Sequence, residues 1–419
     1  SKEILWTKSF LIAPGNMERA PTEISAALGS ALTGPVRLFG ENRERADRLS
    51  AKLRISELLR ERRVREALTE AERLLPLAQR DPTALALYST AVAHGVVEAP
   101  LSERARLLRE GRMAARRAIA LDPRNGEAHY SLAILYQSTD YHRRLMTLNA
   151  GLEQDSRNPS LQRAMAAALT AVGRMAEAER WLLNSLAGDP FSRNAMQSLI
   201  LLYADRQDAH ALETALAEAR SRWPNDRMFV DVELWIAARF LDAERLQRAI
   251  PGIAGLSAAN LTRLQLAAAA IGSQSPESID ALADNCTGPQ ADGAAYGTIC
   301  AYTLAKLDHA DSALAALTIF LEDIAGPTQA EREARFLAHP WHQAKSAILF
   351  REPFANLRGD PRMWALFDQL GLTDYWLTSD AWPDFCSDAR LPLDCAQMAR
   401  DAVRSRSAIT MLSRASGAR

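Results

Sequence analysis

The spacing of helix-ending prolines constrains this chain more than any other feature of its sequence. Asp122-Pro123, Asp189-Pro190 and Trp223-Pro224 each follow a stretch of helical hydrophobic spacing. The intervals are 190 − 123 = 67 and 224 − 190 = 34 residues, so the first is one residue short of two 34-residue units. Because proline lacks an N–H and restricts the residue before it, these sites predict helix ends. A 34-residue period with two helices per unit predicts a stacked helical array.

The central units resemble the tetratricopeptide repeat family. In units that start at Gly126, Pro159 and Arg193, the family's signature positions are occupied by Leu132, Ala133, Tyr136, Gly173, Ala178, Leu199 and Tyr203. The signature tryptophan is absent and is replaced by His129, Gln162 and Met196, so these repeats are degenerate. The resemblance implies an all-α, right-handed superhelical solenoid of helix pairs.

Four regions are predicted along the chain. Residues 1–40 contain two short apolar runs around a helical stretch, which favours a small α/β segment or an N-terminal cap. Residues 41–250 form the repeat array, and residues 251–340 form degenerate helical repeats in which the period decays. Residues 341–419 hold half of the tryptophans and predict an aromatic-rich helical cap, which an array needs at its open end.

Charge and hydropathy limit the functions that this chain can serve. Its formal net charge at pH 7 is −1, with 50 Lys and Arg against 51 Asp and Glu. Nucleic-acid binding normally shows a clear basic excess, so we expect no direct nucleic-acid binding by this chain. No apolar run reaches the roughly 18 residues of a membrane span. Because the chain opens abruptly at Ser1 without a signal peptide, we expect any membrane anchor to lie in an upstream segment.

The sequence predicts no catalytic, cofactor or metal site. It has neither a glycine-rich phosphate loop nor a Gly-x-Ser-x-Gly elbow. His339 and His342 are the only close histidine pair, and no cysteine lies near enough to complete a zinc site with them. We therefore expect no enzyme activity, although a substrate-recognition array that belongs to a larger enzyme remains an alternative.

A binding groove is the remaining candidate site. In tetratricopeptide arrays the first helix of each repeat lines the groove, and the resemblance carries that role to one set of positions. These are Glu127, Tyr130, Ile134, Gln137, Arg163, Ala167, Thr170, Asn194, Gln197, Leu201 and Asp205. Their mixed polarity suits a protein or peptide partner contacted through side-chain hydrogen bonds. The alternative is that they are simply the solvated inner face of the array.

Four cysteines form two local pairs, Cys286 with Cys300 and Cys386 with Cys395. Bridging loops of 14 and 9 residues would stabilise the fold by roughly 2–3 kcal/mol each in the chain-entropy model. Four reduced cysteines in the core of a cytosolic protein are the alternative. The residues alone leave both readings open.

Four stretches near the C-terminus form a linked set: Phe350 to Arg362, Leu370 to Trp376, Trp382 to Cys386 and Leu391 to Cys395. This set resembles the repeat-containing sensor region of CadC-like winged-helix transcriptional regulators. In that family a cytoplasmic winged helix is typically followed by a membrane span and then by the sensor. The resemblance implies that this chain is the periplasmic sensor region of a membrane-anchored regulator, and it favours a disulfide at the second cysteine pair. A cytosolic scaffold that assembles a protein complex is the alternative.

Overall fold

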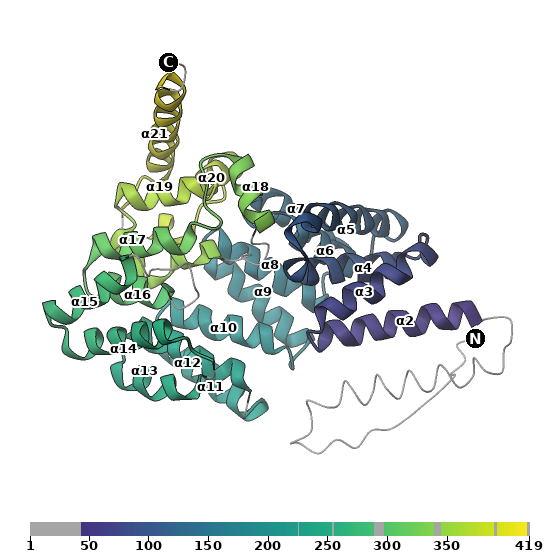
Figure 1. The fold of residues 1–419 in the computed structure, drawn as a ribbon, viewed down its shortest axis with the longest axis horizontal. Coiled ribbons are helices and arrows are strands. Elements are labelled where there is room, and N and C mark those ends of the chain that lie inside the picture. The colour runs from purple at the N-terminus through teal and green to yellow at the C-terminus, as the bar shows by residue number, and fades with distance from the viewer. Residues whose placement is uncertain are drawn as a thin grey trace. The chain divides into compact units, whose positions relative to one another are not determined.

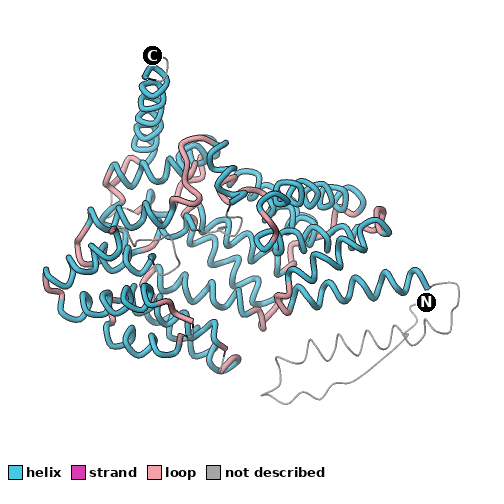
Figure 2. The backbone as a smooth tube through the Cα atoms, in the orientation of Figure 1, coloured by secondary structure: helices cyan, strands magenta, loops and turns pink. Residues whose placement is uncertain are grey.

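The chain folds into helices joined by short loops (Figures 1 and 2). The computed structural model describes residues 43–224, 226–253, 255–288, 297–338, 345–388 and 392–416, and within these ranges it contains no β-strand. The chain divides into two compact units between Leu135 and Tyr136. The α/β segment predicted over residues 1–40 lies outside the described residues.

The first unit contains five α-helices within the described ranges. They are α2 (Arg43–Arg60), α3 (Val64–Leu74), α4 (Pro82–Gly95), α5 (Leu101–Leu121) and α6 (Gly126–Leu135). Helix α4 is the centre of this unit, because it packs against each of the other four. The apolar residues of α3 follow the helical spacing seen in the sequence, and Val64, Ala67, Leu68, Ala71 and Leu74 are all buried.

The Asp81-Pro82 dipeptide stands at the start of α4. The Asp81 side chain accepts hydrogen bonds from the backbone N–H groups of Thr83 and Ala84. Pro82 occupies the first helical position, where its missing N–H would have no intrahelical partner in any case. Asp81-Pro82 therefore marks the boundary between two helices by capping the second one.

The second unit contains the remaining helix pairs and the aromatic C-terminal region. Its paired helices are α7 (Tyr141–Gln154), α8 (Pro159–Ala171), α9 (Met175–Gly188), α10 (Arg193–Asp205), α11 (Ala209–Arg222), α12 (Arg227–Phe240), α13 (Ala243–Ala249), α14 (Ala258–Ser273), α15 (Pro276–Thr287), α16 (Gly297–Lys306) and α17 (Ala310–Leu321). Consecutive helices from α8 to α11 and from α12 to α17 pack against each other, and α10 packs against α12 across the boundary between two pairs, as a tetratricopeptide-like array requires. The all-α, tetratricopeptide-like architecture predicted from the repeat period is confirmed.

The turn between α8 and α9 shows why small residues occupy the signature positions. Gly173 has φ = +87°, a left-handed conformation that L side chains rarely adopt. Ala178 on α9 is fully buried where the two helices cross. A larger side chain at Ala178 would force α8 and α9 apart, because a packed interior has no spare volume.

Residues 345–388, which we call the C-terminal segment, return to the middle of the array. This segment contains η5 (Lys345–Phe350), η6 (Glu352–Leu357), α19 (Pro361–Gln369), α20 (Leu372–Ser379) and η7 (Asp384–Ser387). It packs against α7 and α8 as well as against α16 and α17. The aromatic helical region that we expected as a cap at the end of the chain therefore packs against helices in the middle of the array as well.

Hydrogen bonds to the α8–α9 turn hold the C-terminal segment in place. The Ser346 hydroxyl donates to the carbonyl of Ala171 at 2.9 Å, and the Trp376 indole N–H donates to the carbonyl of Val172 at 3.1 Å. Asp384 binds this turn twice, because its N–H donates to Gly173 O at 3.0 Å and its carboxylate accepts from the Ala176 N–H at 2.8 Å. Four polar contacts therefore join segments that are far apart in the sequence.

The core of the C-terminal segment is aromatic. Phe350 stacks on Phe367 at 5.6 Å, and the ring of Trp376 meets Phe367 edge-on at 5.2 Å. Trp364 is 1% exposed and donates its indole N–H to the carbonyl of Arg358 at 2.8 Å. Edge-to-face and offset-stacked rings of this kind add to the stabilisation from burial alone.

Candidate functional site

The predicted groove residues of the first unit lie on α6 and are largely buried. Tyr130 and Ile134 are 7% and 6% exposed. Glu127 is half-buried, and its carboxylate accepts a hydrogen bond from the Thr90 hydroxyl at 2.6 Å. The Tyr130 hydroxyl lies 3.5 Å from the His94 ring nitrogen Nε2. As placed in the structure, Tyr130 and Ile134 have little side-chain surface for a partner.

In the second unit, three of the predicted groove residues are engaged within the protein. Gln137 is buried and donates to the Thr139 hydroxyl at 2.9 Å. Thr170 is half-buried and donates to Ala166 O within its own helix at 2.6 Å. Asp205, at the end of α10, is buried and pairs with two arginines. These residues serve the fold as placed here, because their polar atoms already have partners.

The remaining predicted residues leave part of the first-helix surface accessible. Asn194 is exposed on α10, and Gln197 and Leu201 on the same helix are half-buried. Arg163 and Ala167 on α8 are also half-buried. The accessible part of the predicted groove thus runs along α8 and α10, while the C-terminal segment binds the last residue of each helix, Ala171 and Asp205.

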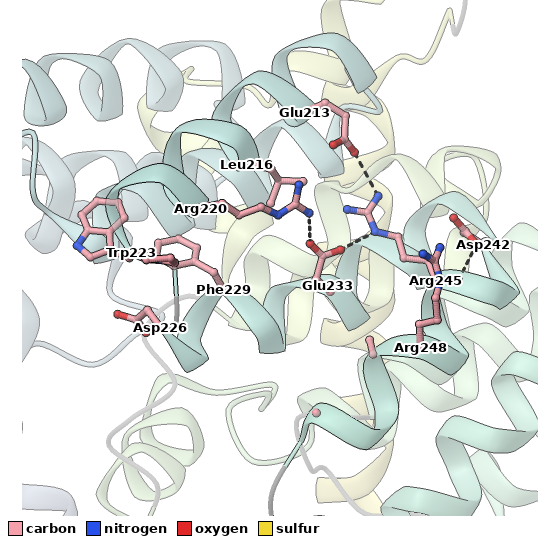
Figure 3. Close-up of a pocket in the computed structure, with 13 residues that line it drawn as sticks. Glu213, Leu216, Arg220, Trp223, Asp226, Phe229, Glu233, Asp242, Arg245 and Arg248 are labelled. Atoms are coloured by element: carbon pink, nitrogen blue, oxygen red, sulfur yellow. Dashed lines mark hydrogen bonds and ion pairs between the residues drawn. The ribbon is translucent and has the colours of Figure 1, made fainter. Parts of the chain in front are cut away.

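A hollow of about 590 Å³, which we call the α11–α13 pocket, lies where α11, α12 and α13 meet (Figure 3). Its main lining residues are Glu213, Leu216, Arg220, Trp223, Phe229, Glu233, Arg245 and Arg248. Helices α11 and α13 are the second members of their pairs, with α12 between them. The pocket is thus lined by these two second helices and by the first helix α12.

A chain of ion pairs crosses the α11–α13 pocket (Figure 3). Glu233 on α12 accepts from Arg220 Nη2 through one carboxylate oxygen and from Arg245 Nε through the other, both at 2.6 Å. Glu213 on α11 accepts from Arg245 Nη1 at 3.3 Å. Although burial lowers the pKa of Arg245, the bonds to Glu233 and Glu213 outweigh it and raise that pKa, so Arg245 stays charged.

An aromatic pair forms the apolar end of the α11–α13 pocket. Trp223 stacks on Phe229 with ring centroids 5.4 Å apart and an interplanar angle of 19°. Sequence reasoning treated Trp223-Pro224 only as the end of a repeat and missed the pocket. The signal in the sequence is Arg245 and Arg248, three residues apart on one short helix and hence on one face, close to an aromatic turn.

The two cysteine pairs named above are joined by disulfide bonds in the structure. The Cys286–Cys300 bridge links α15 to α16, and the Cys386–Cys395 bridge links η7 to the start of α21 (Cys395–Ser416). The second bridge ties the last helix to the C-terminal segment next to Phe385, a member of the aromatic core.

The described ranges contain neither a metal-binding cluster nor a membrane-spanning helix. Their His, Cys, Asp and Glu side chains form no group of three or more that could hold a metal ion. His339 and His342 lie outside these ranges. None of the helices in the described part is both long enough and apolar enough to cross a membrane.

Comparisons with known proteins give structural likenesses of low similarity. No family model matches the chain, and no curated protein matches it. Among solved structures, it is similar to TTC0263, a thermophilic TPR protein of Thermus thermophilus (20% identity, TM-score 0.35, 45% of this chain and 98% of that chain). YrrB, a TPR protein with an unusual peptide-binding site, matches at 17% identity and a TM-score of 0.29 over 47% of this chain and 96% of its own.

A third likeness is to yeast Tom70, at 15% identity and a TM-score of 0.36 over 76% of this chain and 66% of that one. These TM-scores are all low. The helix pairs of the chain itself, and not these likenesses, establish its tetratricopeptide-like architecture.

Proposed function

We propose that this chain is a non-enzymatic, protein- or peptide-binding tetratricopeptide domain. The observation that carries the proposal is the accessible part of the first-helix surface, where Asn194 is exposed and Arg163 and Gln197 are half-buried on neighbouring first helices. Such a surface offers amide and guanidinium groups to the backbone and side chains of an extended chain.

The more specific proposal is that the domain is the periplasmic sensor region of a membrane-anchored, CadC-like transcriptional regulator. Its support is the resemblance over Phe350 to Cys395 together with the two disulfide bonds. Disulfides persist in oxidising compartments such as the bacterial periplasm and are rare in the cytosol. Under this proposal the partner's binding is the signal that the domain senses.

The thiol state in the native host tests the location. The protein is isolated under acid quench, its free thiols are alkylated, and the four cysteines are read by mass spectrometry with and without reductant. Intact Cys286–Cys300 and Cys386–Cys395 bridges are expected for the sensor. Four free thiols would instead place the domain in a reducing compartment and leave the cytosolic scaffold as its function.

Peptide binding is tested separately by selecting a phage-displayed random dodecapeptide library on the immobilised chain. We expect enriched peptides whose affinity falls at least about tenfold in Asn194→Ala with Gln197→Ala, as loss of two side-chain hydrogen bonds implies. The matched control is Asn184→Ala with Gln154→Ala, which removes the same side chains from exposed positions on the second helices α9 and α7. Equal losses in both double variants would rule out the first-helix surface as the site.

A further inference from the structure

The α11–α13 pocket has the chemistry of a binding site that is separate from the first-helix groove. We infer that it binds a peptide through an acidic side chain and a neighbouring apolar side chain. This inference rests on the proposed protein-binding function and assigns to it a second site. Three features of the pocket support this inference. Its carboxylates are already paired, some of its arginine donors are unused, and apolar side chains lie beside them.

Every carboxylate that lines the pocket is already engaged. Glu233 and Glu213 accept from Arg220 and Arg245, as described above. Asp226 caps α12 by accepting from the Met228 N–H at 2.9 Å, and its other oxygen pairs with Arg193 at 2.8 Å. Asp242 caps α13 by accepting from the Arg245 N–H at 2.8 Å. A basic ligand would therefore have to break an existing pair to gain one.

The arginines, in contrast, retain unused donors. Arg248 is exposed and makes one hydrogen bond, from Nε to Glu244 O at 3.3 Å, and no acceptor in the described part of the chain pairs with its two Nη atoms. Within the described part of the chain, Arg220 donates a hydrogen bond only through Nη2, to Glu233. Guanidinium groups present a planar fork that matches a carboxylate and binds it through two parallel hydrogen bonds. The guanidinium donors that remain unused in the pocket can therefore bind an anion.

The apolar side of the pocket favours a peptide over a bare anion. The exposed Pro224 and the half-buried Ala249 line it next to the arginines, and Leu216, Trp223 and Phe229 line it as buried side chains. Its volume of about 590 Å³ exceeds what a single carboxylate fills and has room for two or three side chains. An acidic residue flanked by an aliphatic one would place its carboxylate at Arg248 and its apolar side chain against Pro224 and Ala249.

The test uses the full chain labelled with ¹⁵N-tryptophan and follows the Trp223 indole N–H, assigned with Trp223→Phe. Three capped tetrapeptides serve as probes: acetyl-Gly-Leu-Glu-Gly-amide and its Gln and Lys counterparts. We expect a saturable shift of the Trp223 signal with the Glu peptide and an affinity at least about tenfold weaker for the other two, because an Arg–carboxylate pair is lost. In Arg248→Gln the preference for Glu over Gln should disappear.

The matched control is Arg180→Gln, which removes an exposed arginine from another second helix, α9. This variant should keep the full preference for the Glu peptide. Equal binding of the Glu and Gln peptides, or a Trp223 shift produced by inorganic phosphate as strongly as by the Glu peptide, would overturn the inference. Failure at this pocket is distinguishable from failure of the proposed function, because library peptides sensitive to Asn194 and Gln197 would still be recovered.

Discussion

Asp205 Oδ2 lies 3.0 Å from Nε of Arg351, and this ion pair joins α10 to the C-terminal segment. Oδ1 of the same carboxylate lies 2.5 Å from Nε of Arg239 on α12. Both guanidinium groups also lie over the ring of Tyr302, at 4.9 Å for Arg239 and 5.4 Å for Arg351. Burial and the neighbouring Arg239 lower the pKa of Arg351 to about 10, against the attraction of Asp205. One carboxylate thus balances two cations, the buried Arg239 and the half-buried Arg351.

Replacing Asp205 with Asn should therefore destabilise the protein strongly. Two guanidinium groups would lose their shared counter-charge, and breaking a buried pair from one side typically costs about 3–5 kcal/mol. Urea denaturation followed by circular dichroism measures the change in the free energy of unfolding. Asp311→Asn is the control, because Asp311 pairs with Arg362 on the surface with its side chain 85% exposed. A loss at position 205 no larger than that at 311 would contradict a structural role for the buried pair.

Gly173→Ala tests whether the α8–α9 turn is in contact with the C-terminal segment. A Cβ at this position would lie 2.5 Å from Pro383 Cβ and 2.6 Å from Phe350 Cδ1, in addition to the strain of φ = +87°. We expect a loss of about 2–5 kcal/mol, from about 1–2 kcal/mol of backbone strain and about 1–3 kcal/mol of overpacking. Thermal and urea unfolding report the loss.

Gly255→Ala separates the two contributions. Gly255 has φ = +79°, but a Cβ there would have nothing within 4 Å among the described residues. Its substitution should cost only the backbone strain, about 1–2 kcal/mol. If the two alanine variants were equally stable, the close packing of Gly173 against Phe350 and Pro383 would be wrong.

The repeat period was sufficient to predict the helix pairs but not the path of the C-terminal segment. Pro190 and Pro224 sit at the boundaries of successive pairs, and local rules of helix capping and spacing suffice to place them. The aromatic content of residues 345–388 predicted burial, yet composition does not tell which surface covers it. That surface combines the α8–α9 turn with α7, α16 and α17, and such long-range packing has no local signal.

Asp205 illustrates the same limit at the level of a single residue. Its predicted position on the first helix of a repeat made Asp205 a groove candidate. Asp205 does lie on a first helix, α10. Its partners Arg239 and Arg351 come from other segments, so only the folded chain makes it a buried ion-pair residue. The α11–α13 pocket was missed for a related reason, since it combines residues from three helices.

Removal of each disulfide should lower the free energy of unfolding, and the two losses should add. Cys386→Ser with Cys395→Ser opens a 9-residue loop, and Cys286→Ser with Cys300→Ser opens a 14-residue loop. Each double variant should lose about 2–3 kcal/mol through the greater entropy of its unfolded chain. Because the bridges join different elements, the quadruple variant should lose the sum, measured by urea denaturation. A quadruple variant no less stable than either double variant would argue against two independent bridges.

Asp368 gives the stability of the C-terminal region a dependence on pH. Its carboxylate is 3% exposed, accepts from the Thr373 hydroxyl at 2.6 Å and lies 3.4 Å from Nε of Arg406 on α21. Burial raises the pKa of Asp368 despite these two groups, and the nearby charge of Asp374 raises it further. The folded state therefore favours the protonated acid more than the unfolded state does.

The direction of the effect follows from linkage. A carboxyl group with a raised folded-state pKa contributes stability that is fully present below its unfolded pKa of about 3.9 and is lost as pH rises through the folded pKa. Asp368→Asn keeps the shape but cannot ionise, so it escapes this loss. We expect the free energy of unfolding of the Asn variant, relative to the unmodified chain, to rise between pH 4 and pH 7. Urea denaturation at pH 4, 5, 6 and 7 measures it, and a difference that stays constant or falls over this range would show that Arg406 and Thr373 outweigh burial at Asp368.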